Sequence, residues 1–442
     1  MRKQMRNLMF ATFAAFGMAF LSGCSKAEEQ GSVYYLNFKP EVADIWEELA
    51  DIYTDLTGVE VKILTATGGI YERTLQAEIA KREAPTLFQI NGPVAYQTWQ
   101  NYCLDLKDTE LYSWMSDPTL AVTKGEGVYA IPYVVEGYGI IYNEEITERY
   151  FSLPDKAVSI SSMDEVNNFE LLKQVVEDMT AHKKELGIEG VFASTSFASG
   201  ENWRWHTHLA NLPIYYEFRD KGISDTDVID FTYEPYFKNI LDLYVSNSIT
   251  DKMSLSNKTI MDSMTEFAQG KVAMVQNGNW AWAQISSIEG NTVLEDNIKF
   301  LPIYMGVPGE ESQGLCIGTE NFLAVNTLVS EKDQQATIAF LEWIFSSDIG
   351  KHYITNEFGF ITPFRTFTEE EVPADPLAKE VIKSMDNPDR TSVNWNFNAF
   401  PGPIFKEHFG SAILSYVEGD MTWEDVVSCM KEEWYKRKLE FK

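Results

Sequence analysis

Three apolar, strand-like stretches separated by two helical patterns constrain the fold of this chain more than any other feature. They follow one another in the order 33–38, 41–56, 59–64, 71–81 and 87–90. In the helical stretches the apolar residues recur every three or four positions, whereas the strand-like stretches are short apolar runs. Strand, helix, strand, helix, strand predicts a parallel, doubly wound sheet with right-handed crossovers.

The segment 267–282 (FAQGKVAMVQNGNWAW) predicts a further strand that leads into a helix. Its unbroken apolar run 272–275 is typical of a strand buried on both faces of a sheet. The polar residues 277–279 turn the chain, and Asn279 is a suitable N-cap for a helix that begins at Trp280. Trp280 is therefore expected at the sheet edge where open α/β sheets bind ligands. The alternative is that Trp280 and Trp282 are core aromatic residues.

Two polar residues, Asn91 and Glu136, directly follow or separate predicted strands. Asn91 directly follows the predicted strand 87–90, which places it at the ligand-facing edge. Glu136 lies with Gly137 between two apolar strands of the stretch 128–142. A carboxylate inside an apolar stretch is costly unless it is solvated or hydrogen-bonded. Glu136 is therefore expected either at an exposed turn or in a functional polar site.

From Ser162 onwards the chain is predicted to form a second lobe. Ser162 and Glu165 have the spacing of a capping box, which predicts that a helix begins here and continues to about His182.

Aromatic and cationic side chains gather in the segment 199–208, directly after a predicted strand. Two indoles, a guanidinium and two imidazoles predict a binding wall there, formed by Trp203, Arg204, Trp205, His206 and His208. Residues two apart do not share a face on a helix, so the two histidines do not favour a metal site. The indoles could instead form a helix core. Trp395, in a loop-like stretch, is open to the same two interpretations.

Two of these segments resemble a known family. In 128–143 a Tyr-x-Ile-Pro strand precedes a crossover with a carboxylate and then a Tyr-Asn pair. In 267–282 a helix ends in Gly-Lys, and an apolar strand and a Gly-x-Trp-Ala-Trp turn follow. Both patterns resemble the family 1 extracellular solute-binding proteins of ABC importers. The resemblance implies a two-lobed α/β fold of the periplasmic-binding-protein type II, in which each lobe is a doubly wound, mostly parallel sheet and a multi-crossover hinge joins them.

The resemblance also implies roles for individual residues. Trp280 would stack on a sugar ring, and Glu136 would hydrogen-bond sugar hydroxyls at the hinge. Asn37 and Lys39, at the end of the first strand, resemble polar contacts of the first lobe, and the family places a cleft-lining helix start near Trp203. The predicted ligand-binding set is Trp280, Glu136, Trp203, Trp205, Trp282, Asn37, Lys39, Asn91, Trp395 and Arg204.

The expected domain boundaries follow from the strand order and the resemblance. Lobe 1 is expected over 33–135 and 312–362, and lobe 2 over 136–311 and 363–442. The return to lobe 1 depends on the stretch 314–325, which is expected to form a strand pair there.

The N-terminal residues predict export. Basic residues at positions 2, 3 and 6 precede an apolar run over 8–21, which is shorter than the ~20 residues that a transmembrane helix needs. This pattern predicts a secretory signal over 1–23. Leu-Ser-Gly-Cys at 21–24 resembles the lipobox of bacterial lipoproteins, which implies lipidation of Cys24, a tether over 24–32 and anchoring at the outer face of the cell membrane.

Charge and cysteine content exclude some classes of protein. The formal net charge is −30, and it becomes about −33 when the three basic residues of the predicted signal are removed. Such a surface repels nucleic acid phosphates and anionic lipid heads. Cys103, Cys316 and Cys429 are odd in number and far apart, so buried thiols are expected.

The sequence therefore predicts a binding protein. It contains no GxSxG, GxxxxGK[ST] or GxGxxG motif, so neither catalysis nor a cofactor or metal is expected. The family resemblance implies that the function is the capture of an oligosaccharide by a monomer and its delivery to a permease with a cytoplasmic ATPase. Acids and indoles also form cation cages, so a polyamine-binding protein of the same fold is one alternative. Abundant acid pairs leave a surface glycoside hydrolase as another.

Overall fold

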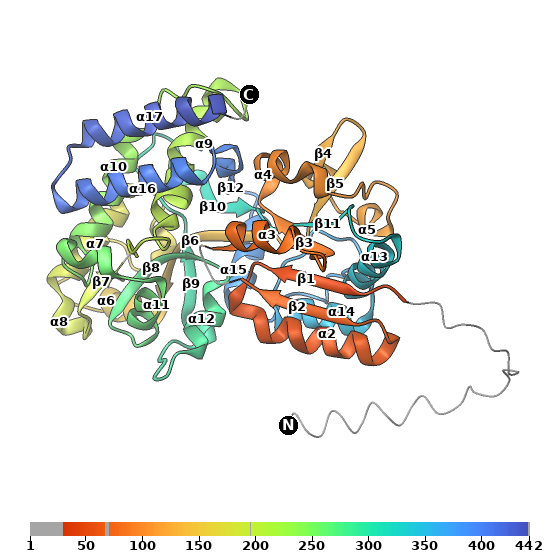
Figure 1. Ribbon diagram of the computed structural model, residues 1–442. Helices are drawn as coiled ribbons and strands as arrows, with labels where there is room; N and C mark the ends of the chain where they lie inside the picture. The colour runs from red at the N-terminus through yellow and green to blue at the C-terminus, as the bar shows by residue number, and fades with distance from the viewer. Residues whose placement is uncertain (1–29, 67–69, 195, 441–442) are drawn as a thin grey trace, which may run out of the picture. The chain divides into compact units, whose positions relative to one another are not determined.

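The computed structural model describes residues 30–66, 70–194 and 196–440 (Figure 1). The described residues from Gly31 onwards form one compact unit, whose strands build two six-stranded mixed sheets. The two-lobed α/β fold expected from the sequence is confirmed, but the expectation that each sheet is mostly parallel is corrected, because both sheets are mixed. The predicted signal peptide, Cys24 and the start of the tether lie outside the described residues.

The first sheet has the strand order β2-β1-β3-β11-β5-β4. β1 pairs in parallel with β2 and β3, as the alternation of strands and helices predicts. β11 is antiparallel to β3 and β5, and β4 is antiparallel to β5, so the parallel part is one half of the sheet. The strands are β1 (Val33–Asn37), β2 (Val61–Thr65), β3 (Leu87–Ile90), β4 (Val122–Lys124), β5 (Gly127–Pro132) and β11 (Phe322–Val325).

The second sheet has the order β12-β10-β6-β8-β7, and β9 also pairs with β6. Strand β8, between β6 and β7, is buried along its whole length, as the unbroken apolar run predicts. β6 is antiparallel to β8, β9 and β10, whereas β7 and β12 add parallel pairs. The strands are β6 (Glu136–Asn143), β7 (Gly190–Phe192), β8 (Val272–Gly278), β9 (Ile298–Leu301), β10 (Gln313–Gly318) and β12 (Thr391–Asn394).

Helices bury their apolar faces against these sheets in separate cores. The helices of the first lobe are α2 (Ala43–Thr57), α3 (Tyr71–Ile79), α4 (Gly92–Trp99), α5 (Glu110–Ser113), α13 (Glu331–Ser346) and α14 (Asp348–His352). Those of the second lobe are α6 (Glu144–Phe151), α7 (Phe169–Ala181), α8 (Lys183–Leu186), α9 (Ala210–Lys221), α10 (Glu234–Ser246), α11 (Ile260–Ala268), α12 (Ala281–Ser287), α15 (Pro376–Met385), α16 (Pro403–Glu418) and α17 (Trp423–Glu440).

One expected strand pair is divided between the two sheets. The stretch 314–325 is expected wholly in lobe 1, but β10 pairs with β6 and β12 of the second sheet, and only β11 joins the first. Residues 319–321 between them are a crossing of the hinge. Both strands are apolar, and an apolar pattern predicts burial without indicating which sheet accepts the strand.

The expected helix start at Ser162 is wrong. Residues Met163–Glu165 form one 3₁₀ turn, in which Glu165 accepts hydrogen bonds from Ser161. Helix α7 begins after Asn168, whose side chain caps the N–H of Leu171. The capping-box pattern therefore stabilises only a 3₁₀ turn. The helix begins later because Asn168 provides its N-cap.

All three cysteines of the folded unit are free thiols. Cys103 and Cys316 are buried as expected, and Cys429 is partly exposed.

Candidate functional site

Strand β8 passes directly into helix α12 at Trp280. The residue has helical dihedral angles (φ −59°, ψ −14°) and a partly exposed side chain. Its indole lies over the backbone of Gly278, where an added Cβ would fall 2.2 Å from the ring. Asn279, the expected N-cap, instead exchanges two hydrogen bonds with the backbone of Gly137 (2.9 and 3.0 Å). The turn that carries Trp280 is thereby fixed to the start of β6.

Five aromatic side chains of the second lobe form a continuous wall around His208. His208 lies edge-on to Trp203 (centroids 4.8 Å apart) and Trp280 (5.5 Å), and it also contacts Trp395 (6.0 Å) and Phe397 (5.4 Å). We call these five residues the aromatic wall. They come from three separate segments, so only the folded chain brings them together.

Within the aromatic wall, two indoles retain accessible surface. Trp203 and Trp280 are partly exposed, and their centroids are 6.1 Å apart. Trp395 is only 7% exposed, because its ring covers Gly318 and packs on Tyr138. The accessible indole surface of the wall therefore belongs to Trp203 and Trp280, while Trp395 packs beneath it.

Trp205 does not belong to this surface. Its side chain is fully buried in the core of the second lobe, stacked on Phe197 (4.8 Å) and edge-on to Tyr244. The expectation that Trp205 contacts ligand is therefore corrected. The residues Arg204–Leu209 form a π-helical turn, in which the two neighbouring indoles Trp203 and Trp205 lie in different environments.

Arg204 lies buried behind Trp203, with its guanidinium 4.3 Å from that ring. It donates one hydrogen bond, to Ser196 (3.0 Å), and its Nε and Nη2 have no partner among the described residues. Burial lowers the pKa of Arg204 to about 9, although the nearby Glu201 acts in the opposite direction. The guanidinium stays charged at pH 7 and contributes positive potential behind the wall.

Trp282 packs in a different core from Trp280. It is partly buried against the cluster that includes Met264, Phe267 and Ile285. Since neighbouring positions of a helix point in different directions, the two indoles of the Trp-Ala-Trp turn cannot share one surface.

Lys39 and Glu136 meet in a buried network at the hinge. Lys39 Nζ lies 2.6 Å from Glu136 Oε1, and Asn321 Nδ2 donates to Glu136 Oε2 (2.5 Å). The amide of Gln89 donates to Asn321 (2.9 Å), and the hydroxyl of Tyr133 donates to Gln89 (2.9 Å). The network connects the first sheet with two crossings of the chain between the lobes. Both oxygens of Glu136 are thus engaged by protein donors.

Asn37 is fully buried, and its side chain shapes the turn that carries Lys39. It donates to the carbonyl of Lys39 (2.9 Å) and to Thr65 (3.1 Å), and it accepts from the N–H of Lys39 (3.0 Å). The expected ligand contact at Asn37 is therefore corrected to a supporting role.

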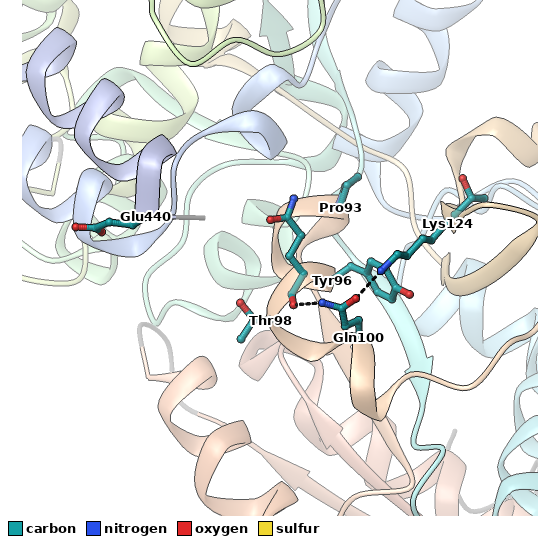
Figure 2. A pocket seen from close by; sticks show the side chains of 8 residues that line it. Pro93, Tyr96, Thr98, Gln100, Lys124 and Glu440 are labelled. Carbon is teal, nitrogen blue, oxygen red and sulfur yellow. Dashed lines mark hydrogen bonds between the residues drawn. The ribbon is translucent and has the colours of Figure 1, made fainter. Parts of the chain in front are cut away.

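Asn91 is partly exposed at the end of β3, and its Oδ1 has no partner among the described residues. A recess opens beyond it on α4, and Figure 2 shows Lys124 and Gln100 hydrogen-bonded there (2.7 Å). None of the ten predicted ligand-binding residues lines that recess. Its lining residues are Pro93, Tyr96, Gln97, Thr98, Gln100, Thr123, Lys124 and Glu440.

Three charged residues outside the predicted ligand-binding set interact electrostatically, namely Glu72, Glu320 and Lys406. Burial lowers the pKa of Lys406, whereas the charges of Glu320 and Glu72 raise it. The positive charge of Lys406 in turn acts on the pKa values of His206 and His208 in the π-helical turn. Glu72 had a usable signal, because it follows the predicted strand 59–64 at the same sheet edge as Asn91. Nothing in the local sequence of Glu320 or Lys406 marks them.

Both histidines of the π-helical turn are uncharged at neutral pH. Burial lowers the pKa of His206 to about 3, with Lys406 acting in the same direction. Burial also brings the pKa of His208 well below its ordinary value, and Arg204 and Lys406 lower it further. His208 Nδ1 has no hydrogen-bond partner in the described part of the chain. The ring therefore offers an unused polar atom within an otherwise apolar wall.

Comparison with known proteins agrees with this architecture. The model of the bacterial extracellular solute-binding protein family matches residues 48–380. The chain belongs to this family, and the resemblance noted in its sequence is confirmed. No curated protein matches the chain.

Solved structures of similar fold cover nearly the whole chain. A chitin oligosaccharide binding protein is 18% identical (TM-score 0.69) and aligns over 93% of this chain and 100% of its own. RafE in complex with raffinose is 16% identical (TM-score 0.67; 92% and 99% covered). A sugar transporter from Bacillus licheniformis in complex with stachyose is 17% identical (TM-score 0.66; 91% and 100% covered). At these identities the likeness shows the fold.

Proposed function

We propose that this chain is the substrate-binding component of an ABC importer and that it captures an oligosaccharide between its two lobes. The observation that carries the proposal is the pair of partly exposed indoles formed by Trp280, after the end of β8, and Trp203, before the π-helical turn. Sugars present an apolar C–H face, which fits a flat indole, and a rim of hydroxyls, which needs polar partners. The names of the similar structures, which mention raffinose, stachyose and chitin oligosaccharide, support the same ligand class.

The free energy expected from covering the two indoles is adequate for sugar binding. Covering ~200 Å² of indole surface at ~25 cal/mol/Å² contributes about 5 kcal/mol before ordering costs. Polar contacts from the opposite lobe would add to this and bring the complex into the micromolar range. A ligand that contacts both lobes stabilises the closed arrangement, because only that arrangement supplies both sets of contacts.

Two separate observations disfavour the alternatives. The guanidinium of Arg204 lies 4.3 Å from the ring of Trp203, and it would repel a polyamine placed against that indole. Hydrolysis would require a carboxylate pair at a defined separation around a glycosidic bond, and the family is one of binding proteins. We therefore propose binding without catalysis.

The remaining parts of the proposal concern location. Lipidation of Cys24 would hold the protein at the outer face of the membrane, where a permease and its ATPase would take up the sugar from the monomer. In the described part of the chain we find no helix whose length and apolar content would let it cross a membrane.

A thermal-shift screen of the purified protein tests the function. We expect raffinose, stachyose, maltose or chitin oligosaccharides to raise the melting temperature, because a ligand of the native state stabilises it by mass action. Spermidine should give no shift. A shift with spermidine alone would support the polyamine alternative, and release of reducing sugar would support the hydrolase.

A further inference from the structure

Arg204 is the one buried cation of the described residues that has no carboxylate partner. Three cationic side chains are buried in this part of the chain, those of Lys39, Arg204 and Lys438. Lys39 pairs with Glu136, and Lys438 pairs with Asp225. Arg204 is only 1% exposed, yet no described carboxylate lies within 4.0 Å of its nitrogens. Because an unpaired buried charge is costly, this guanidinium calls for an anionic partner from outside these residues.

The two free nitrogens of Arg204 are the pair that fits one carboxylate. Nη1 donates to Ser196 Oγ (3.0 Å), whereas Nε and Nη2 have no partner among the described residues. The N–H groups of Nε and Nη2 are parallel and lie on the same side of the planar guanidinium, spaced for the two oxygens of a carboxylate. We call this pair of donors the guanidinium fork. A single neutral hydroxyl cannot match both donors in this way, and it brings no negative charge.

Glu201 is the nearby carboxylate of the chain, and it is engaged elsewhere. Burial lowers the pKa of Arg204, and the charge of Glu201 acts in the opposite direction. However, Glu201 Oε2 accepts the N–H of Ile260 (3.0 Å), the first residue of α11. The N-terminus of a helix is a favourable place for a carboxylate. Glu201 thus leaves the guanidinium fork open to another carboxylate.

The guanidinium fork lies directly beside the aromatic wall. The Cζ atom of Arg204 is 4.3 Å from the centre of the Trp203 ring, which is partly exposed and lies 6.1 Å from Trp280. A surface turn precedes Trp203, since a Cβ added at Gly200 would meet nothing within 4 Å. The buried guanidinium is therefore one indole away from accessible surface. A displacement of Trp203 would bring a sugar at the wall within reach of the fork.

The net negative charge of the chain is compatible with one carboxylate on a small ligand. The formal net charge is −30, but most acidic side chains of the described residues are not buried. Exposed charges are screened beyond about 8 Å at physiological ionic strength, and buried ones are screened much less. A carboxylate at the fork therefore interacts mainly with the guanidinium that it touches.

We propose that the guanidinium fork of Arg204 binds the carboxylate of an acidic sugar residue, so that the oligosaccharide captured by this protein contains a uronic acid. The proposal rests on the function proposed above and names its substrate class more closely. The sugar covers the accessible indole surface of Trp203 and Trp280, while its carboxylate becomes the partner that the buried cation lacks. A sugar that carries an ammonium group at this place is repelled.

Isothermal titration of the full chain with matched acids and esters tests the carboxylate. The probes are trigalacturonic acid and a xylo-oligosaccharide that carries glucuronic acid, each compared with its methyl ester, which keeps the rings and the length but loses the charge. We expect at least one acid to bind about tenfold more tightly than its ester, or better. If neither acid binds more tightly than its ester while neutral sugars bind, the carboxylate site is disproved and the proposed function stands.

Substitutions of Arg204 locate the carboxylate. Arg204→Met should remove the advantage of the acid and leave the affinity for the ester within about twofold. Arg204→Lys keeps the charge but lacks the two parallel donors, so it should keep only part of the advantage. Arg219→Met is the matched control, because this half-exposed guanidinium also lies over an aromatic ring (4.7 Å from Tyr216) but pairs with Asp220 (2.9 Å). An acid preference that persists in Arg204→Met would disprove the proposal.

The melting temperature of the ligand-free variants separates binding from a structural role. Removing an unpaired buried charge should leave the melting temperature of Arg204→Met unchanged or raise it, because the cost of burying the guanidinium is relieved. Similar falls in Arg204→Met and Glu201→Gln would show that these two residues are partners in solution, which would contradict the proposal. If no sugar binds, acidic or neutral, the proposed function fails as well.

Discussion

Lys39 and Glu136 form a buried ion pair, 2.6 Å between Nζ and Oε1, that joins the end of β1 to the first residue of β6. Lys39 is 5% exposed and Glu136 is 3% exposed, so neither charge can be solvated if the other is removed. Glu41 is a weaker second partner of Lys39 at 3.5 Å. The pair thus anchors the passage of the chain from the first sheet to the second, at the place where hinge motion would be centred.

Lys39→Met should strongly destabilise the ligand-free protein. Removing one partner of a buried pair leaves an uncompensated charge, which costs about 3–5 kcal/mol. Lys81→Met is the control, because its ion pair with Glu78 has the same length (2.6 Å) but an exposed lysine, and exposed pairs contribute about 0–1 kcal/mol. Urea unfolding measures both, and equal losses would contradict the structural role of Lys39.

The same pair predicts a loss of stability at alkaline pH. Burial acts to lower the pKa of Lys39, but Glu136 and Glu41 outweigh it, so the pKa is raised above 10.5. Because the folded-state pKa is the higher one, this stabilisation is complete below pH 10.5 and is lost as the pH rises through the folded-state pKa. Melting temperatures between pH 9 and pH 12 should fall more steeply for the unaltered protein than for Lys39→Met.

Trp280→Ala and Trp205→Ala should separate binding from stability. Trp280 is partly exposed in the aromatic wall, so we expect about tenfold weaker sugar binding and a nearly unchanged melting temperature of the free protein. Trp205 is fully buried, so its truncation should cost about 3–5 kcal/mol of folding free energy. A large loss of stability in Trp280→Ala with unaltered affinity would show that Trp280 is a core residue and does not bind the ligand.

The contrast between these two indoles shows what the sequence could predict. The passage from strand to helix at Trp280 was predicted from an apolar run and a turn, which are local patterns, and the structure confirms this passage. The segment 199–208 was predicted as a binding wall, but a pattern of residues cannot say which of Trp203 and Trp205 faces the core. That depends on the π-helical turn, which has no signal of its own in the sequence.

Pairings between distant segments could not be predicted from local sequence patterns. β10 and β11 are both apolar, and their division between two sheets depends on partners as distant in sequence as β6 and β3. For the same reason the electrostatic interaction between Glu72 and Lys406 was not predicted, since the two residues are 334 positions apart (406 − 72). The hinge network was predicted in part, because Lys39 and Glu136 were both identified, but as ligand contacts and not as partners of each other.

Gly278→Ala should weaken sugar binding without unfolding the protein. An added Cβ at position 278 would fall 2.2 Å from the indole of Trp280, so the ring must move away from its place in the aromatic wall. The backbone strand itself need not change, because alanine adopts extended conformations readily. Near-ultraviolet circular dichroism should report the displaced indole, and titration should report the lower affinity. An unchanged aromatic spectrum together with unchanged binding would contradict the position of Trp280.

Asp375→Asn should reduce the pH dependence of stability between about pH 4 and pH 7. Burial raises the pKa of Asp375 to about 7, although the N–H groups of Ala378 and Leu377 favour its charged form. The folded state therefore keeps a proton that the unfolded state releases above pH 3.8, so this group makes stability fall as the pH rises from 3.8 to about 7. The slope should lie below the limit of about 1.4 kcal/mol per pH unit, because the side chain is partly exposed. Asparagine keeps the cap of α15, since its oxygen can still accept from the N–H of Ala378.

Asp117→Asn is the matched comparison for Asp375→Asn. Hydrogen bonds from Thr119 lower the pKa of Asp117, so its contribution has the opposite sign and is lost as the pH falls through the folded-state pKa. Urea unfolding at several pH values should therefore show the asparagine variant at 375 gaining stability relative to the unaltered protein as the pH rises towards 7. No such gain in stability with rising pH is expected for Asp117→Asn. Parallel curves for Asp375→Asn and the unaltered protein would show that Asp375 is ionised in the folded state well below pH 7.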